Sequence, residues 1–327
     1  MSERAISKSP LVSVVMPAYN AARHIAESIE SVREQTFEDW ELIVVDDGST
    51  DDTRIIVETY AAREARLRCF QRPNGGPAAA RNTGLREARG TLVAFLDADD
   101  LWLSGKLEAQ LALLEEKDVD LVYTDGDIFS DEATQSPDER FHIVAGETRG
   151  VEMFRTLFAS NHIGTLSVLV KREALDAVGL FDENLVGGIC EDYDLWLRLA
   201  RNGASFYGIA EKLVKYRRHA ASTTHTPSKL FAAMLAVLKK HGRDPALDEK
   251  VVKTRIRNLY RALAEALVRE GKVAQAGRCL EEFAAWDGTV VTRAQRFVLK
   301  VWPRSFNFIS REFLFRIEWH LNSGPGR

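Results

Sequence analysis

Short apolar runs alternate with helix-like segments along the amino-terminal part of the chain, and the apolar runs end at proline or acidic residues. The runs cover residues 11–16, 42–45 and 92–96. Between them, apolar side chains spaced three or four apart predict helices over residues 22–35, 51–63 and 78–88, with a further strand at 67–70. This alternation predicts an α/β fold with a mainly parallel sheet covered by helices on both faces.

Polar groups follow three of the predicted strands. The segments are Pro17-Ala18-Tyr19-Asn20, Asp46-Asp47-Gly48-Ser49 and Asp97-Ala98-Asp99-Asp100. In an open parallel sheet, ligands bind beyond the carboxyl ends of the strands. We therefore expect the three segments to line one ligand-binding crevice.

The charge distribution divides the chain of 327 residues into two parts. Residues 1–220 carry 25 Lys and Arg against 38 Asp and Glu, whereas residues 221–327 carry 19 against 10. An acidic body does not favour nucleic acid as a partner, but it can hold a cation. From residue 228 onward the pattern is helical, with a helical hairpin predicted around Gly271. We expect a polar lead at 1–9, a first domain at 10–225 and a basic helical region at 226–327.

The cysteines and the amino terminus bear on the compartment. Cys69, Cys190 and Cys279 are too far apart for a CxxC metal site and too few for a disulfide framework. The first residues lack the apolar core of a secretory signal, and no run reaches the ~18 apolar residues of a membrane span. These features predict a cytoplasmic protein.

The acidic segment after the run 92–96 is a candidate metal site. Asp97, Asp99 and Asp100 would stand together at the mouth of the sheet, where their mutual repulsion needs a counter-charge. Hard oxygen ligands of this kind suit Mg²⁺ or Mn²⁺, which also bind substrate phosphates. The alternative is a solvated turn, in which Asp is common.

The first two polar segments suit a nucleotide. Tyr19 offers a flat face for a base, and the carboxylates of Asp46 and Asp47 can accept from a base or a ribose. Gly75 and Gly76 permit close backbone approach, and Arg81 with Asn82 would begin the following helix on the same crevice. Simpler interpretations stay open: Asp-Gly is a turn signal, an aromatic beside proline is often packing, and Arg81 could pair with an acidic residue.

Two later segments add chemistry. Glu191 and Asp192 stand at the start of a predicted helix over 192–202, where a carboxylate either caps the helix or acts as a general base. Arg217, Arg218 and His219 could stabilise a diphosphate leaving group. A strand is expected at 166–171 and a loop at 130–140. The variable loops 126–165 and 183–190 are the expected acceptor pocket.

Five ordered blocks resemble the family 2 glycosyltransferases. They lie at residues 14–20, 45–49, 75–82, 96–100 and 191–196. The resemblance implies a GT-A fold, which is a Rossmann-like and mainly parallel sheet flanked by helices, here followed by a C-terminal α-helical extension. It also implies a nucleotide-diphospho-sugar donor, a divalent metal (Mn²⁺ or Mg²⁺) and inverting displacement at the anomeric carbon.

The resemblance also implies residue roles. Donor-binding positions would be Pro17, Ala18, Tyr19, Asn20, Asp46, Asp47, Gly76, Arg81, Asp97 and Ala98. The metal would be held chiefly by Asp99, with Asp97 and His219. Asp192 resembles the catalytic base that deprotonates the acceptor hydroxyl, with Glu191 as its alternative. The expected activity is hexosyl transfer from a UDP-sugar to a glycan or lipid-linked acceptor, in cell-surface polysaccharide or glycolipid assembly.

Other functions are less well supported by the motifs. A nicotinamide oxidoreductase would carry GxGxxG after the first strand, and a P-loop protein would carry GxxxxGK[ST]; neither occurs. A sugar nucleotidyltransferase would place a basic, glycine-rich loop there. An inactive relative that serves as a nucleotide-sugar-binding or scaffolding subunit stays open as the alternative.

The carboxyl-terminal segment 293–319 interleaves aromatic and basic side chains. Such a segment suits either a peripheral contact with anionic lipid on the inner face of the membrane, or packing as a helical cap on the catalytic domain or on a second copy of the chain. Pro303 interrupts the helical spacing and favours packing.

Overall fold

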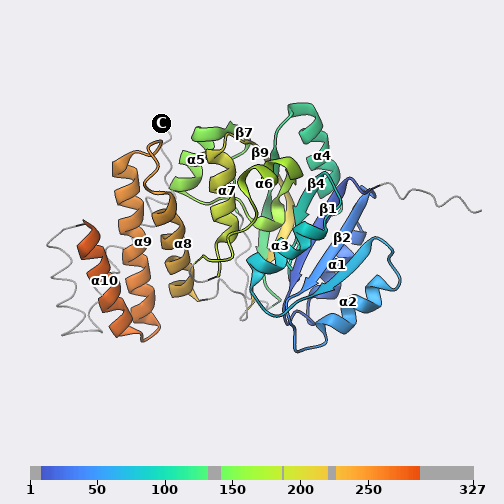
Figure 1. Cartoon of the computed structure of the whole chain (residues 1–327), viewed down its shortest axis with the longest axis horizontal. Helices are drawn as coiled ribbons and strands as arrows, with labels where there is room; N and C mark the ends of the chain where they lie inside the picture. Colours follow the sequence, from blue (N-terminus) through green and yellow to red (C-terminus); the bar gives the residue numbers. More distant parts are fainter. Residues whose placement is uncertain (1–8, 132–140, 186–187, 220–225, 288–327) are drawn as a thin grey trace, which may run out of the picture. The chain divides into compact units, whose positions relative to one another are not determined.

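The computed structural model describes residues 9–131, 141–185, 188–219 and 226–287 (Figure 1). The chain divides into two compact units, Met1–Ser222 and Thr223–Arg327. The domain boundary expected at residue 225 falls next to this division. The lead at residues 1–8, most of the predicted loop 130–140 and the aromatic, basic segment 293–319 lie outside the described residues.

The described residues of the first unit contain one nine-stranded sheet. Its strand order is β3-β2-β1-β4-β8-β6-β9-β5, and β7 pairs with β9. The strands are β1 (Val12–Ala18), β2 (Trp40–Asp46), β3 (Leu67–Gln71), β4 (Leu92–Phe95), β5 (Leu101–Trp102), β6 (Leu121–Phe129), β7 (Gly146–Arg149), β8 (Leu169–Lys171) and β9 (Ser205–Arg217). The apolar runs of the sequence are thus the central strands. Their continuous burial explains why they lack an alternating polar face.

The sheet is mixed rather than uniformly parallel. Strands β3, β2, β1 and β4 are parallel, as predicted, and so are β6 and β9. Strand β8 lies antiparallel between β4 and β6. The segment 166–171 is therefore only partly a strand, because the 3-10 helix Thr165–Ser167 (η1) precedes β8.

Helices cover the two faces of the parallel half. On one face, Val12, Val14 and Met16 pack in the core with residues of α1 (Ile25–Arg33), α2 (Thr53–Ala61) and α4 (Lys106–Lys117). On the other face, Ile43 and Val45 pack against α3 (Pro77–Glu87). A Cβ at Gly84 of α3 would lie 2.5 Å from a methyl of Val15, so glycine lets this helix approach the sheet. The three-layer α/β architecture is the predicted fold class.

Three further helices belong to the first unit: α5 (Gly150–Ala159), α6 (Arg172–Val178) and α7 (Glu191–Arg201). Helix α7 packs against both α5 and α6. The segment 126–165, expected as a variable loop, thus contains the end of β6, β7 and α5. The expectation that this whole segment is a loop was wrong. Residues 150–159 form α5 because one face of the helix is apolar and buried, with Met153, Phe154, Leu157 and Phe158.

The second unit is helical where it is described, as predicted (Figure 1). Its helices are α8 (Pro227–His241), α9 (Glu249–Arg269) and α10 (Val273–Asp287), with α9 packed against both others. The side chain of Asp248 accepts from the Val251 N–H and caps α9. Gly271, with φ of 75°, makes the turn of the predicted hairpin. Among the described helices, none combines the length and apolar character that a membrane span requires.

Candidate active site

The carboxyl ends of β1 and β2 bring the first two polar segments together. Ala18 and Asp46 are partners in the parallel register, and the Asp47 N–H donates to the Ala18 carbonyl at 2.8 Å. The Asn20 side-chain oxygen accepts from the Thr50 N–H at 2.8 Å, and Asn20 has a positive φ of 48°. The two loops therefore form one connected surface, as the sequence predicts.

Asp46 and Asp47 use their carboxylates differently. Asp47 accepts from the N–H groups of Gly75, at 3.1 Å, and Gly76, at 2.7 Å, and it lies 3.4 Å from the Arg72 guanidinium. Asp47 thus orders the glycine loop that precedes α3. Asp46 is fully buried and accepts from Ser49 at 2.9 Å through one oxygen, while its other oxygen has no hydrogen-bond partner among the described residues. Buried acceptors of this kind are usually satisfied by a protein group, an ordered water or a ligand.

The other predicted donor-binding residues fall into exposed and buried groups. Tyr19 is 52% exposed, which leaves its ring available for stacking, and Pro17 is half-buried. Ala18 and Ala98 belong to the hydrophobic core. Gly76 stands before α3 with φ of 86°, a conformation that favours glycine.

Arg81 joins the candidate metal segment Asp97–Asp100 to the acidic pair Glu191 and Asp192. Its guanidinium is buried, donates to Asp97 at 2.5 Å and also donates to Glu191. Burial acts to lower the pKa of Arg81, but the charges of Asp97 and Glu191 outweigh it and raise that pKa, so the side chain stays a cation. The sequence left open whether Arg81 pairs with an acidic residue, and the structure shows that it does. One nitrogen, Nε, has no hydrogen-bond partner among the described residues.

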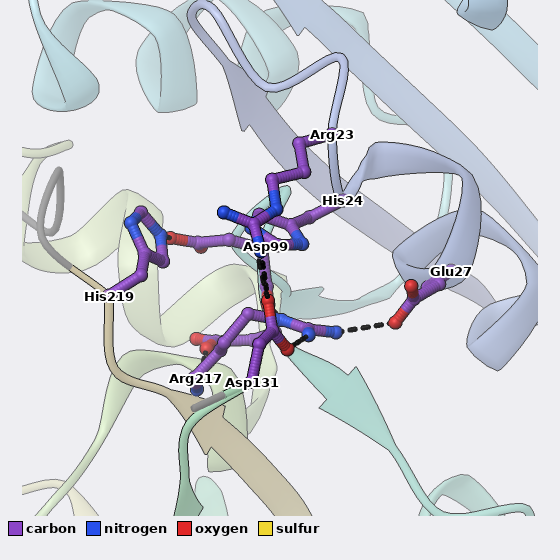
Figure 2. A network of polar contacts seen from close by, with 8 residues as sticks. Arg23, His24, Glu27, Asp99, Asp131, Arg217 and His219 are labelled. Carbon is purple, nitrogen blue, oxygen red and sulfur yellow. Dashed lines mark hydrogen bonds and ion pairs between the residues drawn. The ribbon is translucent and has the colours of Figure 1, made fainter. Parts of the chain in front are cut away.

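His219 meets the acidic segment after β4, although the sequence separates them widely. Its Nε2 lies 2.8 Å from Oδ2 of Asp99 (Figure 2). Burial and the neighbouring charge of Asp97 raise the pKa of Asp99, against the opposing effect of His219. The side chains of Asp97, Asp99 and His219 are 31%, 32% and 21% exposed, so all three are accessible from solvent.

Asp97, Asp99 and His219 are residues of the types that bind a divalent cation. Two carboxylates and an imidazole form a donor set compatible with Mn²⁺ or Mg²⁺. Burial and the nearby charge of Asp97 both disfavour the ionised form of Asp99 and so raise its pKa, whereas a bound cation would favour that form. Within the described part of the chain, no three His, Cys, Asp or Glu side chains are already gathered as a metal cluster. A cation would have to draw Asp99 away from His219 or bind beside the pair.

Arg217 is engaged with protein groups rather than open to a diphosphate. Its Nε donates to the main-chain carbonyl of Asp99 at 2.8 Å, and its main-chain N–H donates to the Asp100 carboxylate at 2.7 Å. The rest of the guanidinium binds Glu27, at 2.5 Å, and Asp131 (Figure 2). The sequence pointed to a cation here, but nothing in it linked that cation to Glu27 or Asp131.

Asp192 is held at the start of α7. One carboxylate oxygen accepts from the Thr165 hydroxyl at 2.5 Å, and the other accepts from the Tyr193 N–H at 2.7 Å. Burial raises the pKa of Asp192, while the bonds from Thr165 and the charge of Arg81 oppose that rise. Burial also raises the pKa of Glu191. Glu191 is bonded to Arg81, whereas the described residues give Asp192 a hydroxyl and a main-chain N–H as hydrogen-bond partners and no guanidinium.

Thr165 was missed by the sequence analysis. It lies 27 positions before Asp192 in η1, and a threonine in an apolar segment carries no sign of a distant carboxylate. The sequence predicted a strand only over 166–171 and placed Thr165 at the end of the variable loop 126–165. The structure thus adds Thr165, Glu27 and Asp131 to the residues of the candidate site.

Sequence comparisons identify relatives. The family model described as "Glycosyl transferase family 2" matches residues 13–178. The Bacillus subtilis protein TuaG, a glycosyltransferase provisionally assigned to teichuronic acid biosynthesis, is 35% identical over 209 residues, which is 64% of this chain and 79% of TuaG. The Escherichia coli enzyme WfgD is 32% identical over 222 residues, which is 67% of this chain and 81% of WfgD. WfgD is named UDP-Glc:alpha-D-GlcNAc-diphosphoundecaprenol beta-1,3-glucosyltransferase.

Solved structures share the fold. TarS 1–349 of S. aureus in complex with UDP-GlcNAc has a TM-score of 0.57 at 24% identity, covering 79% of this chain and 72% of that one. The mannosyltransferase PcManGT from Pyrobaculum calidifontis, in complex with GDP-Man and Mn²⁺, has a TM-score of 0.58 at 21% identity, covering 90% and 85%. The family match and these relatives confirm the predicted GT-A fold and the resemblance. The chain is a glycosyltransferase that belongs to glycosyl transferase family 2.

Proposed function

We propose that the chain transfers a hexosyl group from a UDP-sugar to an acceptor hydroxyl, with inversion at the anomeric carbon and dependence on a divalent metal. One observation carries the proposal: Arg81 bonds both Asp97 and Glu191, so the candidate metal segment and the acidic pair Glu191 and Asp192 lie on either side of one guanidinium. A donor diphosphate beside Asp97 and an acceptor hydroxyl beside Asp192 would then lie close enough to react.

In this mechanism Asp192 is the general base. It takes the proton of the acceptor hydroxyl as the acceptor oxygen attacks the anomeric carbon, and no covalent intermediate with the protein forms. Asp97, Asp99 and His219 would hold the metal, which when bound offsets the charge of the departing diphosphate. The raised pKa of Asp192 makes it a stronger base than an exposed Asp, and the Thr165 hydroxyl orients its carboxylate.

The donor and acceptor classes rest on relatives. WfgD is named for UDP-Glc and a diphosphoundecaprenol-linked acceptor, and its β-linked product fits inversion of an α-linked donor. TarS was solved with UDP-GlcNAc, whereas PcManGT was solved with GDP-Man and Mn²⁺. We infer a UDP-sugar and a lipid-linked or glycan acceptor in cell-surface polysaccharide or glycolipid assembly. A cytoplasmic location, at the inner face of the membrane when a lipid-linked acceptor is used, follows from that proposal.

A panel of UDP-, GDP- and dTDP-sugars with Mn²⁺ or Mg²⁺ tests the proposal, with release of the nucleoside diphosphate as the readout. Slow hydrolysis of a UDP-hexose, abolished by the chelator EDTA and restored by Mn²⁺, is expected. Binding of a donor with no turnover in any acceptor mixture would instead favour the alternative, an inactive nucleotide-sugar-binding or scaffolding subunit. The chain keeps Asp97 and Asp99 as well as Glu191 and Asp192, and the presence of these four carboxylates argues against that alternative.

A further inference from the structure

Arg217 occupies a junction of separate chain segments. It is the last residue of β9, and its side chain is only 3% exposed. The guanidinium contacts Glu27 of α1 and Asp131 after β6, as Figure 2 shows. It also contacts the Asp99 carbonyl after β4. It also lies over the ring of Phe129, 4.6 Å from the centroid. A planar guanidinium held at three edges and one face has little freedom to rotate.

The contact with Asp99 is with its main chain, which leaves the carboxylate available. Nε of Arg217 donates to the Asp99 carbonyl, and the Asp99 carboxylate points to His219. The neighbouring Asp100 is held by the main-chain N–H of Arg217 instead of its side chain. Replacing the Arg217 side chain would therefore release Asp99 while the bond to Asp100 stays.

Charge makes such a restraint necessary. Asp97, Asp99 and Asp100 lie within four positions of one another, so their carboxylates repel. Asp100 is fully buried, and one of its oxygens has no hydrogen-bond partner among the described residues. Without the Arg217 guanidinium bonded to the Asp99 carbonyl, the main chain of residues 97–100 would move so that the carboxylates lie farther apart.

We infer that Arg217 is a positioning residue for metal binding: its anchored guanidinium fixes the main chain of Asp99 so that the Asp99 carboxylate stands beside His219. The inference rests on the metal dependence given in the proposed function. It differs from the expectation that Arg217 contacts the diphosphate, because the guanidinium is already engaged by protein groups.

Arg68 offers a matched control. It also contacts two carboxylates, Glu41 and Glu87, one main-chain carbonyl, that of Glu87, and one aromatic ring, that of Phe70. It belongs to β3, at the far edge of the sheet in the strand order from β9. Because the Arg68 side chain is 23% exposed and that of Arg217 only 3%, Arg68→Met removes a similar set of contacts at a more exposed position.

The test measures Mn²⁺ binding directly, by electron paramagnetic resonance of the free ion with UDP present, on the full chain. Arg217→Met is expected to weaken Mn²⁺ binding about 10- to 100-fold, the usual effect of removing a group that orients a metal ligand. Arg217→Lys should recover part of that loss, because it keeps the charge but cannot serve three acceptors at once. Arg68→Met should bind Mn²⁺ like the wild type.

The outcomes separate this inference from the proposed function. If the wild type binds Mn²⁺, Asp99→Asn loses binding and Arg217→Met keeps it, the positioning role is wrong and the metal site stands. If the wild type binds no Mn²⁺ with UDP, metal dependence is wrong and the inference falls with it. If Arg217→Met does not fold, Arg217→Lys decides: wild-type affinity overturns the inference, and a loss that Arg68→Met lacks supports it.

Discussion

Arg81 and Glu191 form a buried ion pair that joins the first turns of α3 and α7, across 110 positions of sequence. Their side chains are 5% and 7% exposed. Because Arg81 also donates to Asp97, this ion pair links Glu191 of α7 to the candidate metal segment after β4. We therefore expect loss of the Arg81–Glu191 ion pair to affect both the stability of the fold and the activity.

Removing the cation of this pair should destabilise the fold strongly. Arg81→Met leaves the buried Glu191 without a counter-charge, and we expect the free energy of unfolding to fall by about 3–5 kcal/mol at pH 8. The double variant Arg81→Met/Glu191→Gln should recover part of that loss, because it removes the isolated charge. Urea unfolding of both variants measures the effect. Equal stability of the single and double variants would show that Glu191 is not the group left unpaired.

Loss of the proposed base should slow transfer without weakening donor binding. Asp192→Asn keeps the shape of the side chain but cannot accept a proton, and kcat should fall about 100-fold or more. The affinity for UDP should stay within about twofold, since Asp192 contacts Thr165 and the main chain of α7. Asp176→Asn, which removes an exposed carboxylate of α6, is the control. Transfer by Asp192→Asn at the wild-type rate would exclude Asp192 as the base.

Thr165 should set the pH dependence of that base. The hydroxyl bond stabilises the ionised carboxylate of Asp192, so Thr165→Val should raise the pKa of Asp192 further. Arg81, which opposes the rise, and Asp97, which adds to it, stay in place. A base works only when deprotonated, so the acid limb of kcat/KM should move to higher pH. Thr156→Val, which removes a hydroxyl of α5 bonded to a main-chain carbonyl, should leave the profile unchanged. An unshifted acid limb in Thr165→Val would argue against this link.

Metal removal should abolish activity reversibly. Treatment with EDTA should stop release of the nucleoside diphosphate, and Mn²⁺ should restore it, because Asp97 and Asp99 otherwise face the diphosphate with like charge. Asp99→Asn should need at least about tenfold more Mn²⁺ for half-maximal activity. Full activity after exhaustive chelation, checked by elemental analysis for residual metal, would contradict a metal-dependent mechanism.

Lys106 gives the fold a distinct dependence on pH. Its ammonium group is buried, donates to Gln110 at 2.7 Å and lies 3.9 Å from the centroid of the Trp102 ring. Burial lowers its pKa well below the ordinary value, so at high pH the unfolded chain holds a proton that the folded chain has lost. Stability should therefore rise with pH, by about 1.4 kcal/mol per unit, between the folded and unfolded pKa values.

Comparison with Lys106→Met isolates that contribution. Below the folded pKa both states bind the proton, so the difference between wild type and variant should be constant there. Above it, the wild type should gain stability relative to the variant until the unfolded value of about 10.4 is passed. Urea unfolding from pH 7 to pH 10 supplies both curves. Parallel curves over the whole range would mean that Lys106 titrates normally in the folded state.

The sequence predicted the central strands, the helices between them and the helical hairpin, because these depend on neighbouring residues. Continuous burial of β1 and β2 requires apolar runs, and the turn after α9 requires a residue such as Gly271 that accepts a positive φ. The expectation that polar groups meet at one edge followed from the parallel arrangement of β1, β2 and β4. Family membership followed from five local blocks in a fixed order.

Tertiary structure alone decided which groups meet. Arg81 and Arg217 were both apparent as cations near the crevice, but their partners Glu191, Glu27 and Asp131 come from distant segments. Thr165 reaches Asp192 because β8 inserts antiparallel next to β4, an arrangement that no local pattern in the segment encodes. Local periodicity and turn chemistry are properties of a few consecutive residues, whereas an ion pair or an oriented carboxylate depends on how separate elements pack.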